Sequence, residues 1–326
     1  MAAVDLSIII VNWNTRQLLG RCLSSLAQSS DGMQLEVIVV DNNSEDDSVE
    51  YVAQHFSEVQ IIRNNCNRGF AAASNQGIAI ARGRNILFLN SDTIVHKGAL
   101  KAMAELLDNT SEAGLCSCRL LNSDGSTQPN VYHFPSFRAM LQRYTALKYL
   151  GLFKSARAFY KMRDFSYGAA TSVDCVMGAV SMVKWEVLDH IGNIDEKLYF
   201  YFEDTDLCYR IKQAGFKIYF TPNGEITHLG RASSSLLGAH KVHAMFFKSL
   251  LYYFRKHKGR GKTFLFSCVF KPGVCIYMLC EVVFGFCSAL VFWCLRRGSV
   301  KIRRRLERAQ ESFLFLAKYG VSFLLY

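Results

Sequence analysis

Polar residues that directly follow short apolar runs are the first candidates for chemistry in this sequence. Three such clusters carry amide, hydroxyl and carboxylate groups: Asn12 and Asn14; Asp41 and Asn43; and Asn90, Ser91 and Asp92. Carboxylates in such positions can bind a cation or a hydroxyl-bearing ligand. Because Asn, Asp and Ser are also ordinary turn and helix-capping residues, each cluster alone could be structural. Three of them in equivalent positions favour a binding site.

A second group of candidates lies where three acids stand within four residues. Glu203, Asp204 and Asp206 follow the aromatic run at residues 198–202 and open a helical pattern. Like charges at this spacing repel one another unless something offsets them. A carboxylate in partly apolar surroundings keeps enough basicity to accept a proton. The pattern therefore predicts a proton acceptor, with helix capping as the alternative.

Alternating strands and helices over the first 120 residues would bring the polar clusters together. Apolar, β-branched runs predict strands at residues 6–11, 35–40, 59–62 and 85–89. Helical patterns lie at residues 16–27, 48–55, 71–81 and 99–107. This alternation predicts an α/β fold with a mostly parallel central sheet and helices on both faces. Since ligands bind beyond the carboxyl ends of parallel strands, the clusters should share one edge of the sheet.

The middle of the chain is less regular. Residues 122–170 are rich in aromatic and basic side chains, and we interpret them as a helical insertion or lid. A β pattern resumes at Val173. A helix at residues 207–214, closed by Gly215, then precedes a strand at residues 217–220.

Charge is distributed unevenly along the 326 residues, whose formal net charge is +11. Residues 1–240 hold 22 Lys and Arg against 24 Asp and Glu, whereas residues 241–326 hold 16 against 3. We therefore expect a globular domain at 1–240, with halves at 1–120 and 121–240, and a basic, apolar helical tail at 241–326. Half of the residues are hydrophobic, which excludes a disordered or fibrous protein. Because the bases lie in an apolar tail, no nucleic-acid partner is expected.

The tail contains a run long enough to cross a bilayer. Residues 274–295 carry one charged side chain, Glu281, and basic residues flank the run on both sides. A simple span would export one basic cluster, so we expect a monotopic or re-entrant element, broken at Pro272 and Gly273, on a surface of anionic lipids. A single transmembrane segment, a packed helical domain and a homo-oligomer interface stay open as alternatives.

Cysteine use and the N-terminus bear on location. The chain has 11 cysteines, an odd number without zinc-site spacing, which predicts free thiols in a reducing compartment. Residues 1–6 contain no basic segment ahead of a long apolar run, so no secretory signal is expected. We therefore expect the protein on the cytoplasmic face of the cell membrane.

Seven motifs follow one another along the chain: VNWNT, VVDNNSEDDS, NRGFAAASNQG, FLNSDT, VDCVMGA, FYFEDTDLCYRIKQAGF and THLG. Taken in this order they resemble the inverting family 2 glycosyltransferases, in particular the rhamnosyltransferase-like branch, over residues 4–235. The resemblance implies a Rossmann-like GT-A fold, a nucleotide-sugar donor, a divalent cation and inversion at the anomeric carbon. On this reading, residues 1–120 are the nucleotide-binding half and 121–240 the acceptor and catalytic half.

The resemblance assigns the early clusters to the donor and the metal. Asp41 resembles the family's nucleoside-binding Asp, and the amides beside it are those of Asn12, Asn14 and Asn43. Arg68 and Gly69 precede a helix whose N–H groups could approach the phosphates. Asp92 resembles the last acid of the family's DxD motif, in which Asn90 and Ser91 take the first two places.

The later motifs supply the remaining roles. His228 resembles the family's second metal ligand, and hard oxygen ligands suit Mg²⁺ or Mn²⁺. Asp204 resembles the catalytic base, with Glu203 orienting the acceptor. Asp174 resembles a residue of the donor-sugar pocket. Arg210 either offsets the acidic cluster or meets the diphosphate, and the sequence does not choose between these.

The expected function is that of an inverting, metal-dependent glycosyltransferase in cell-surface polysaccharide synthesis. It would move a sugar, L-rhamnose from dTDP-rhamnose in our expectation, onto a lipid-linked or glycan acceptor. One alternative is a sugar nucleotidyltransferase, although residues 12–16 lack the Gly-rich phosphate loop of that class. The other is an inactive, membrane-docked nucleotide-sugar-binding module, against which the joint presence of Asp41, Asp92, Asp204 and His228 argues.

Overall fold

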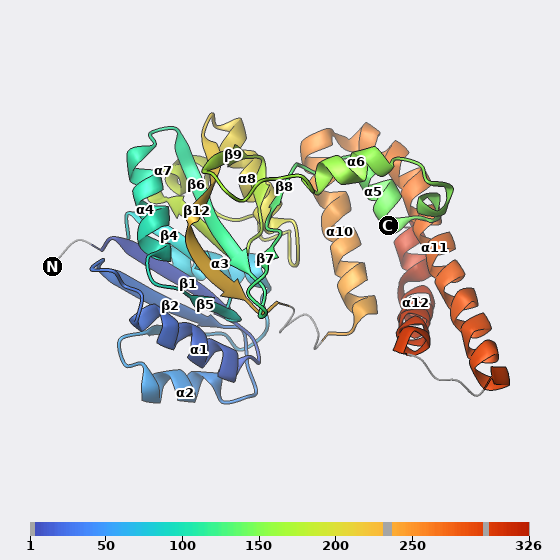
Figure 1. Cartoon of the computed structure of the whole chain (residues 1–326), viewed down its shortest axis with the longest axis horizontal. Helices are drawn as coiled ribbons and strands as arrows, with labels where there is room; N and C mark the ends of the chain where they lie inside the picture. Colours follow the sequence, from blue (N-terminus) through green and yellow to red (C-terminus); the bar gives the residue numbers. More distant parts are fainter. Residues whose placement is uncertain (1–3, 231–236, 296–299, 326) are drawn as a thin grey trace. The chain divides into compact units, whose positions relative to one another are not determined.

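The structure is a computed structural model that describes residues 4–230, 237–295 and 300–325, except for the side chains of residues 289–295 (Figure 1). The basic pair at residues 296–297, which follows the apolar run, lies outside the described residues.

The chain divides into two compact units, each made of two separate segments. The first, which we call the α/β unit, comprises Met1–Phe134 and Asp164–Ser233. The second, the helical unit, comprises Pro135–Arg163 and Ser234–Tyr326. Residues 135–163, which the sequence placed in the larger domain, thus belong with the C-terminal helices.

Ten of the described strands form one sheet in the α/β unit, in the order β3-β2-β1-β4-β11-β6-β12-β5, with β7 beside β6 and β9 beside β12. β8 and β10 pair separately. The strands are Leu6–Asn12 (β1), Leu35–Asp41 (β2), Gln60–Arg63 (β3), Asn85–Leu89 (β4), Thr93–Val95 (β5), Ala113–Leu121 (β6), Thr127–Gln128 (β7), Val131–Tyr132 (β8), Thr171–Val173 (β9), Cys175–Val176 (β10), Val180–Lys184 (β11) and Lys217–His228 (β12).

Strand direction changes across the sheet. β3, β2, β1 and β4 are parallel to one another, and β6 is parallel to β12. Between these groups, β11 runs antiparallel to both β4 and β6. Asn12 of β1 and Asp41 of β2 are register partners, so the first two polar clusters begin at the same edge. The predicted α/β class is confirmed, with a parallel half that carries these clusters and a mixed half beyond it.

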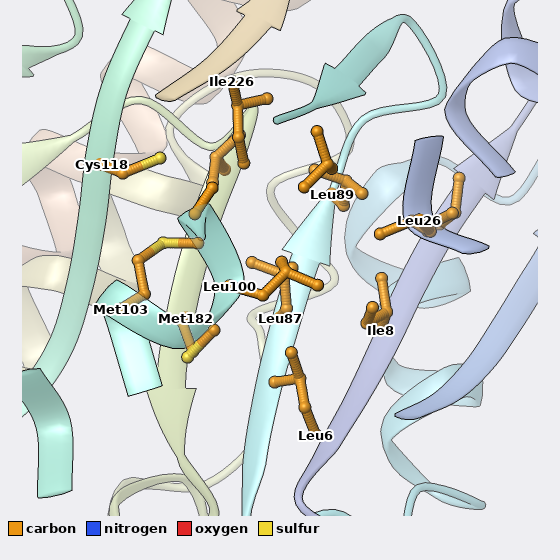
Figure 2. Close-up of a cluster of buried hydrophobic side chains, with 14 of the residues drawn as sticks. Leu6, Ile8, Leu26, Leu87, Leu89, Leu100, Met103, Cys118, Met182 and Ile226 are labelled. Atoms are coloured by element: carbon orange, nitrogen blue, oxygen red, sulfur yellow. The ribbon is translucent and has the colours of Figure 1, made fainter. Parts of the chain in front are cut away.

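Helices cover both faces of the sheet, because the strands carry apolar side chains on both faces. Side chains of a strand alternate between the two faces, and on one of them Leu6 and Ile8 of β1 join a buried cluster with Leu26 and Leu100 (Figure 2). On the other face, Ile9 contacts α3. The helices are Arg16–Ala27 (α1), Ser48–His55 (α2), Phe70–Ile78 (α3), Ala99–Asn109 (α4), Trp185–Ile191 (α7) and Glu203–Gln213 (α8). Because both faces of the sheet are apolar and covered, a polar ligand can bind only at the edge of the sheet.

The helical unit is built from two stretches of chain that are far apart in sequence. Its helices are Phe137–Tyr144 (α5), Ala146–Leu150 (η1, a 3₁₀ helix), Lys154–Tyr160 (α6), Ala239–Lys258 (α10), Arg260–Leu295 (α11) and Val300–Leu325 (α12). α11 and α12 form an antiparallel hairpin, and α10, α5 and η1 also pack on α11. At Gly285, a Cβ would overlap that of Ala309, so the two helices approach as closely as their backbones allow.

α11 continues without interruption through Pro272, so the predicted break at Pro272 and Gly273 is wrong. Proline removes one N–H from the helical hydrogen bonds, and tertiary packing commonly overrides that local preference. Here Gly273 lies against Thr145, which holds the helix from the side at this point. Within the described residues, one segment, Arg260–Ser288, has the length and composition to cross a membrane, and most of it is not buried.

Candidate functional site

Asp41 ends β2 and is held by a local network of donors. Its side chain is buried, and Asn12 Nδ2 donates to Asp41 Oδ1 at 2.9 Å. The backbone N–H and the hydroxyl of Ser44 donate to the two carboxylate oxygens at 2.9 and 2.6 Å. The carboxylate is thus fixed in one orientation at the edge of the sheet.

Asn14 and Asn43 occupy the turns that follow β1 and β2. Both have positive φ, 53° and 66°, a conformation that Asn adopts more readily than most residues. Asn14 Oδ1 accepts a hydrogen bond from the backbone N–H of Glu45 at 2.7 Å, and its own N–H donates to Ser44 Oγ at 2.9 Å. The two turns are therefore tied together, with Asn43 exposed beside them.

Thr15 extends this network to the next strand. Its hydroxyl donates to Asn12 Oδ1 at 2.6 Å and lies 2.8 Å from Ser91 Oγ, just beyond β4. Side chains thus join the ends of β2, β1 and β4, which the sequence predicted to share one edge.

Arg68 and Gly69 form the entry to α3. Gly69 has a φ of 82°, and a Cβ there would lie 2.6 Å from the ring of Tyr199, so no other residue fits. The buried Asn42 side chain holds this loop, because it donates to the Gly69 carbonyl at 3.2 Å and accepts from the Arg68 N–H at 3.4 Å. The Arg68 side chain itself is exposed. Since Tyr199 precedes Glu203 by four residues, the loop before α8 reaches the start of α3.

Asp92 and His228 meet beyond β4 and β12. Both are largely buried, and Asp92 Oδ1 lies 3.4 Å from His228 Nε2. Asn90 Nδ2 is 3.5 Å from the same nitrogen. The backbone N–H of Leu229 donates to the Asp92 carbonyl at 2.9 Å and holds the two chain segments together.

Gln128 determines which ring nitrogen of His228 carries a hydrogen. Its amide nitrogen donates to the His228 carbonyl at 3.1 Å and to Asn122 Oδ1 at 2.9 Å, so its oxygen is the atom 2.7 Å from His228 Nδ1. Nδ1 must therefore donate, which leaves Nε2, the nitrogen that faces Asp92, as the one that can bind a metal. A ring nitrogen and a carboxylate that face each other in this way can bind a divalent cation between them. No group of three or more His, Cys, Asp or Glu gathers as a metal site in the described part of the chain.

The turn before α8 is strained. Tyr201 and Phe202 both have positive φ, 66° and 70°, which bulky side chains rarely adopt. Backbone strain of this kind persists where the surrounding structure enforces it, commonly at functional sites. The turn delivers Glu203 and Asp204 to the first turn of α8, where the helix dipole favours negative charge.

The two carboxylates of this turn have different partners. Asp204 accepts hydrogen bonds from the N–H groups of Gly178 at 2.9 Å and Thr205 at 2.6 Å. Glu203 Oε2 is inaccessible to solvent and has no hydrogen-bond partner. Burial, and then the neighbouring charge of Asp204, raise the pKa of Glu203 to about 8. Burial also raises the pKa of Asp204, but its N–H donors oppose the effect. Of the two carboxyl groups, Glu203 is therefore the one that its surroundings favour in the protonated form, whereas hydrogen bonds favour the charged form of Asp204.

Short backbone links connect Asp204 with the other predicted residues. The N–H of Asn90 donates to the Ala179 carbonyl at 2.9 Å, and Gly178, which precedes Ala179, donates to Asp204. A continuous series of bonded groups thus crosses the sheet edge: Asp41, Asn12, Thr15, Ser91, Asn90, Ala179, Gly178 and Asp204. Asp92, between Ser91 and β5, belongs to the same edge.

The Asp174 carboxylate is not isolated, because two basic side chains contact it. Lys212 Nζ contacts its Oδ1, and His133 Nδ1 lies 2.6 Å from its Oδ2. Although burial acts in the opposite direction, the hydrogen bonds from Lys212 and His133 hold the pKa of Asp174 below its usual value. Asp174 is therefore anchored in place by two bases that the sequence did not single out.

Arg210 offsets acidic charge, which is one of the two roles left open by the sequence. Its Nε lies 2.8 Å from Asp206 Oδ2, and its Nη1 donates to the carbonyls of Ile191 and Gly192 at 3.0 and 3.1 Å. It thus joins the start of α8 to the end of α7 and neutralises the buried Asp206.

Several residues that shape this edge were missing from the sequence prediction. Thr15 and Ser44 lay within the polar clusters and Gly178 within a motif, so their positions carried a signal. Nothing in the sequence pointed to Gln128, because its role depends on a contact with His228, which is 100 residues away. A surface cavity of about 760 Å³ lies elsewhere, along α1, and is lined by Arg16, Arg21 and Tyr51 rather than by any predicted residue.

Known proteins resemble this chain over most of its length. The model of the family "Glycosyl transferase family 2" matches residues 7–174, which is more than half of the chain. An N-acetylglucosaminyl-diphospho-decaprenol L-rhamnosyltransferase of Mycobacterium tuberculosis is 24% identical over 72% of this chain and 81% of its own. The rhamnosyltransferase WbbL of Escherichia coli is 25% identical over 68% of this chain and 82% of its own.

A solved structure supports the same fold. The mannosyltransferase PcManGT of Pyrobaculum calidifontis, determined with GDP-Man and Mn²⁺, superposes with a TM-score of 0.54 at 16% identity. The match covers 98% of this chain and 83% of that one. The predicted GT-A fold is therefore confirmed.

Proposed function

This chain belongs to glycosyl transferase family 2 and is a glycosyltransferase, and from that premise we propose that it is an inverting, metal-dependent enzyme that transfers L-rhamnose from dTDP-rhamnose. The acceptor in this proposal is a lipid-linked or growing cell-surface glycan at the cytoplasmic face of the membrane. The similarity to two rhamnosyltransferases supports the choice of sugar. The mycobacterial relative is named for its acceptor, N-acetylglucosaminyl-diphospho-decaprenol, which supports a lipid-linked substrate.

The bonded series from Asp41 to Asp204 is the observation that carries the proposal. A nucleotide-sugar is long, and it needs separate partners for its nucleoside, its diphosphate and its sugar. Asp41, Asp92 and Asp204 lie in this order along one edge of the sheet. The order of these three residues thus matches the order of the donor groups that we assign to them.

The nucleoside end of the donor would bind beside Asp41. Its carboxylate has a fixed orientation and can accept a hydrogen bond from a base N–H or a ribose hydroxyl. Asn14 and Asn43 flank it in the two adjoining turns. The N–H groups at the start of α3, after Arg68 and Gly69, can approach the diphosphate.

Asp92 and His228 would hold the divalent cation, and Asn90 and Ser91 would contact the donor beside it. A bound cation neutralises the charge that develops on the departing diphosphate. The Gln128 oxygen accepts the Nδ1 hydrogen of His228, so Nε2 is the nitrogen left for a metal. An imidazole ligand favours Mn²⁺ over Mg²⁺ in this pair of ions.

Asp204 would act as the base. Inversion requires the acceptor hydroxyl to attack the anomeric carbon opposite the departing nucleotide while its proton is removed. The N–H donors of Gly178 and Thr205 favour the charged form of Asp204, which supports Asp204 as the acceptor of that proton. Glu203, protonated at neutral pH, can donate a hydrogen bond and orient the acceptor. Asp174, held by Lys212 and His133, would line the sugar pocket.

A donor panel tests the proposal. Purified protein would be assayed for hydrolysis and transfer with dTDP-rhamnose and with UDP- and GDP-sugars, in Mn²⁺, in Mg²⁺ and in chelator. We expect turnover of dTDP-rhamnose above all others, higher in Mn²⁺ and abolished by chelator. Preference for another nucleotide-sugar would overturn the donor assignment, and full activity in chelator would overturn the metal assignment.

A further inference from the structure

We infer that the helical unit docks on an anionic membrane through one outward face of α11, with this helix lying along the membrane surface and not across the bilayer. The inference rests on the proposed membrane association, and it does not depend on the donor or on the catalytic residues. It adds the surface that binds and the orientation of the helix.

α11 turns apolar side chains away from its own unit. Its inward stripe repeats every four residues, as Phe266, Phe270, Val274, Met278 and Val282, all buried. Eight other apolar side chains of α11 are at least half exposed: Phe264, Leu265, Val269, Ile276, Leu279, Val283, Phe284 and Phe286. We call these eight residues the α11 outer face. A helix that is apolar on its solvent side needs a further partner.

Charged groups are kept off this face. Only Lys271 and Glu281 carry charge between residues 264 and 287. Lys271 Nζ is 3.5 Å from the Leu324 carbonyl of α12, and Glu281 Oε1 accepts from the Tyr149 hydroxyl at 3.1 Å. Both side chains therefore point to the neighbouring elements, and the outer face is uncharged over about 35 Å of helix.

Lysines of the neighbouring helices lie near the same height as the middle of α11, which argues against a span. Phe247 of α10 packs its ring 5.6 Å from Phe270 of α11 and 5.8 Å from Phe315 of α12, so these three positions are level. Directly beside them, Lys248 and Lys318 are exposed. If α11 crossed a bilayer at this height, both ammonium groups would enter the hydrocarbon. Lipid can therefore contact one side of the unit, as in a monotopic protein.

Tyr149 extends the outer face with a residue from the middle of the chain. Its ring lies 6.4 Å from that of Phe284, and Leu150, next to it in η1, is 71% exposed. The segment at residues 135–163 thus takes part in the docking surface, together with the C-terminal helices.

Charge identifies a lipid surface as the occupant. The helical unit holds 23 Lys and Arg against 3 Asp and Glu, a net charge of +20, whereas the α/β unit holds 15 against 24, a net charge of −9. A second copy of the unit would bring +20 against +20, which opposes a dimer through this face. An anionic bilayer offers both the apolar interior and the opposite charge.

The first test measures partition of the full-length protein between buffer and vesicles of phosphatidylcholine with phosphatidylglycerol. Leu279→Glu, on the outer face, should lower the partition coefficient about tenfold or more, since one apolar side chain leaves the lipid and a charge would enter it. Ile80→Glu is the matched control, because it adds the same charge at an exposed apolar residue of the α/β unit. It should leave partition within about twofold, and vesicles of phosphatidylcholine alone should bind the native protein more weakly.

The second test measures depth. A fluorophore on single cysteines at Cys268, at Cys287 and at Ile276→Cys would be quenched by nitroxides near the headgroup and deep in the acyl chains. A helix along the surface predicts the same shallow depth at all three sites. A deeper reading at Ile276→Cys than at both ends would mean that α11 spans the bilayer.

Two other outcomes would overturn the inference. If Leu279→Glu partitions like the native protein, the outer face does not dock. If it instead turns a dimer into a monomer in light scattering without changing partition, the occupant of the face is a second copy. Donor hydrolysis, measured in every variant, separates these outcomes from a failure of the proposed chemistry, and its retention shows that the α/β unit is folded.

Discussion

The α/β unit and the helical unit handle apolar side chains and charge in opposite ways. The α/β unit buries its apolar strands on both faces, carries a net charge of −9 and gathers its polar groups at one edge of the sheet. The helical unit carries +20 and leaves one side of its longest helix apolar and exposed. Our proposals therefore assign chemistry and membrane location to separate parts of the chain, and each can be tested by changes that leave the other intact.

The sharpest separation should come from Asp204→Asn. Removing the base should lower kcat by about a thousandfold, because a positioned base contributes roughly 10² to 10⁴ in rate. Affinity for the nucleotide, measured by calorimetry, should change by less than about fivefold, and vesicle binding should not change. A variant with near-native turnover would contradict the role of Asp204.

The cation is the next point at which the α/β unit can be tested alone. His228→Ala should raise the Mn²⁺ concentration for half-maximal activity by about a hundredfold, and Gln128→Leu by about tenfold, because outer partners of metal ligands tune affinity. His96→Ala is the control, since His96 directly follows β5 and its Nε2 lies 2.9 Å from Thr227 Oγ1 and not beside Asp92. Equal effects of His228→Ala and His96→Ala on the Mn²⁺ titration would contradict the site.

A change at Gly285 should disturb only the helical unit. Gly285→Ala places a Cβ against Ala309, and overpacking of this kind costs about 1 to 3 kcal/mol. Gly261→Ala is the matched control on the same helix, where nothing lies near the added carbon and the better helix former should stabilise slightly. Hydrogen exchange would follow both variants. Faster exchange in α12 is expected for Gly285→Ala alone, with exchange in the sheet unchanged; equal exchange in the two variants would argue against the close approach.

The smallest effect concerns pH and Glu203. Since the pKa of Glu203 is raised to about 8, the native enzyme should lose a few-fold in kcat as the pH rises through 8 and Glu203 loses its proton. Glu203→Gln should remove this alkaline limb. The folded state holds this proton between the ordinary carboxyl pKa and about 8, whereas the unfolded state does not, so stability falls as pH rises through that interval. Glu203→Gln should flatten this fall in thermal melts, and an unchanged alkaline limb would contradict the coupling.

Local patterns were sufficient for much of the α/β unit. The predicted helices at residues 16–27 and 48–55 and the strand at 85–89 agree with the structure residue for residue, because their periodicity and flanking polar residues are local signals. The shared sheet edge was also predictable, since parallel strands end together. The antiparallel placement of β11 between β4 and β6 was not, because strand order depends on pairings distant in sequence.

The helical unit was harder to predict for the same reason. Local preference at Pro272 indicated a break, but contacts with Thr145, more than a hundred residues earlier, accompany a continuous helix. The partnership of Gln128 with His228 and that of Asp174 with Lys212 are likewise tertiary. In each case the sequence identified the residue and its chemistry but did not identify the residue that contacts it.

The excursion of the chain between Phe134 and Asp164 has a consequence for biosynthesis. During translation these residues leave the ribosome roughly a hundred residues before the helices that cover them. Their aromatic side chains therefore lack their packing partners while the sheet is already forming. Phe137, which stacks on Phe266, is one such residue. A gene that ends before α10 would therefore produce a protein whose residues 135–163 expose apolar surface and promote aggregation. To express the α/β unit alone, these residues should be replaced with a short linker.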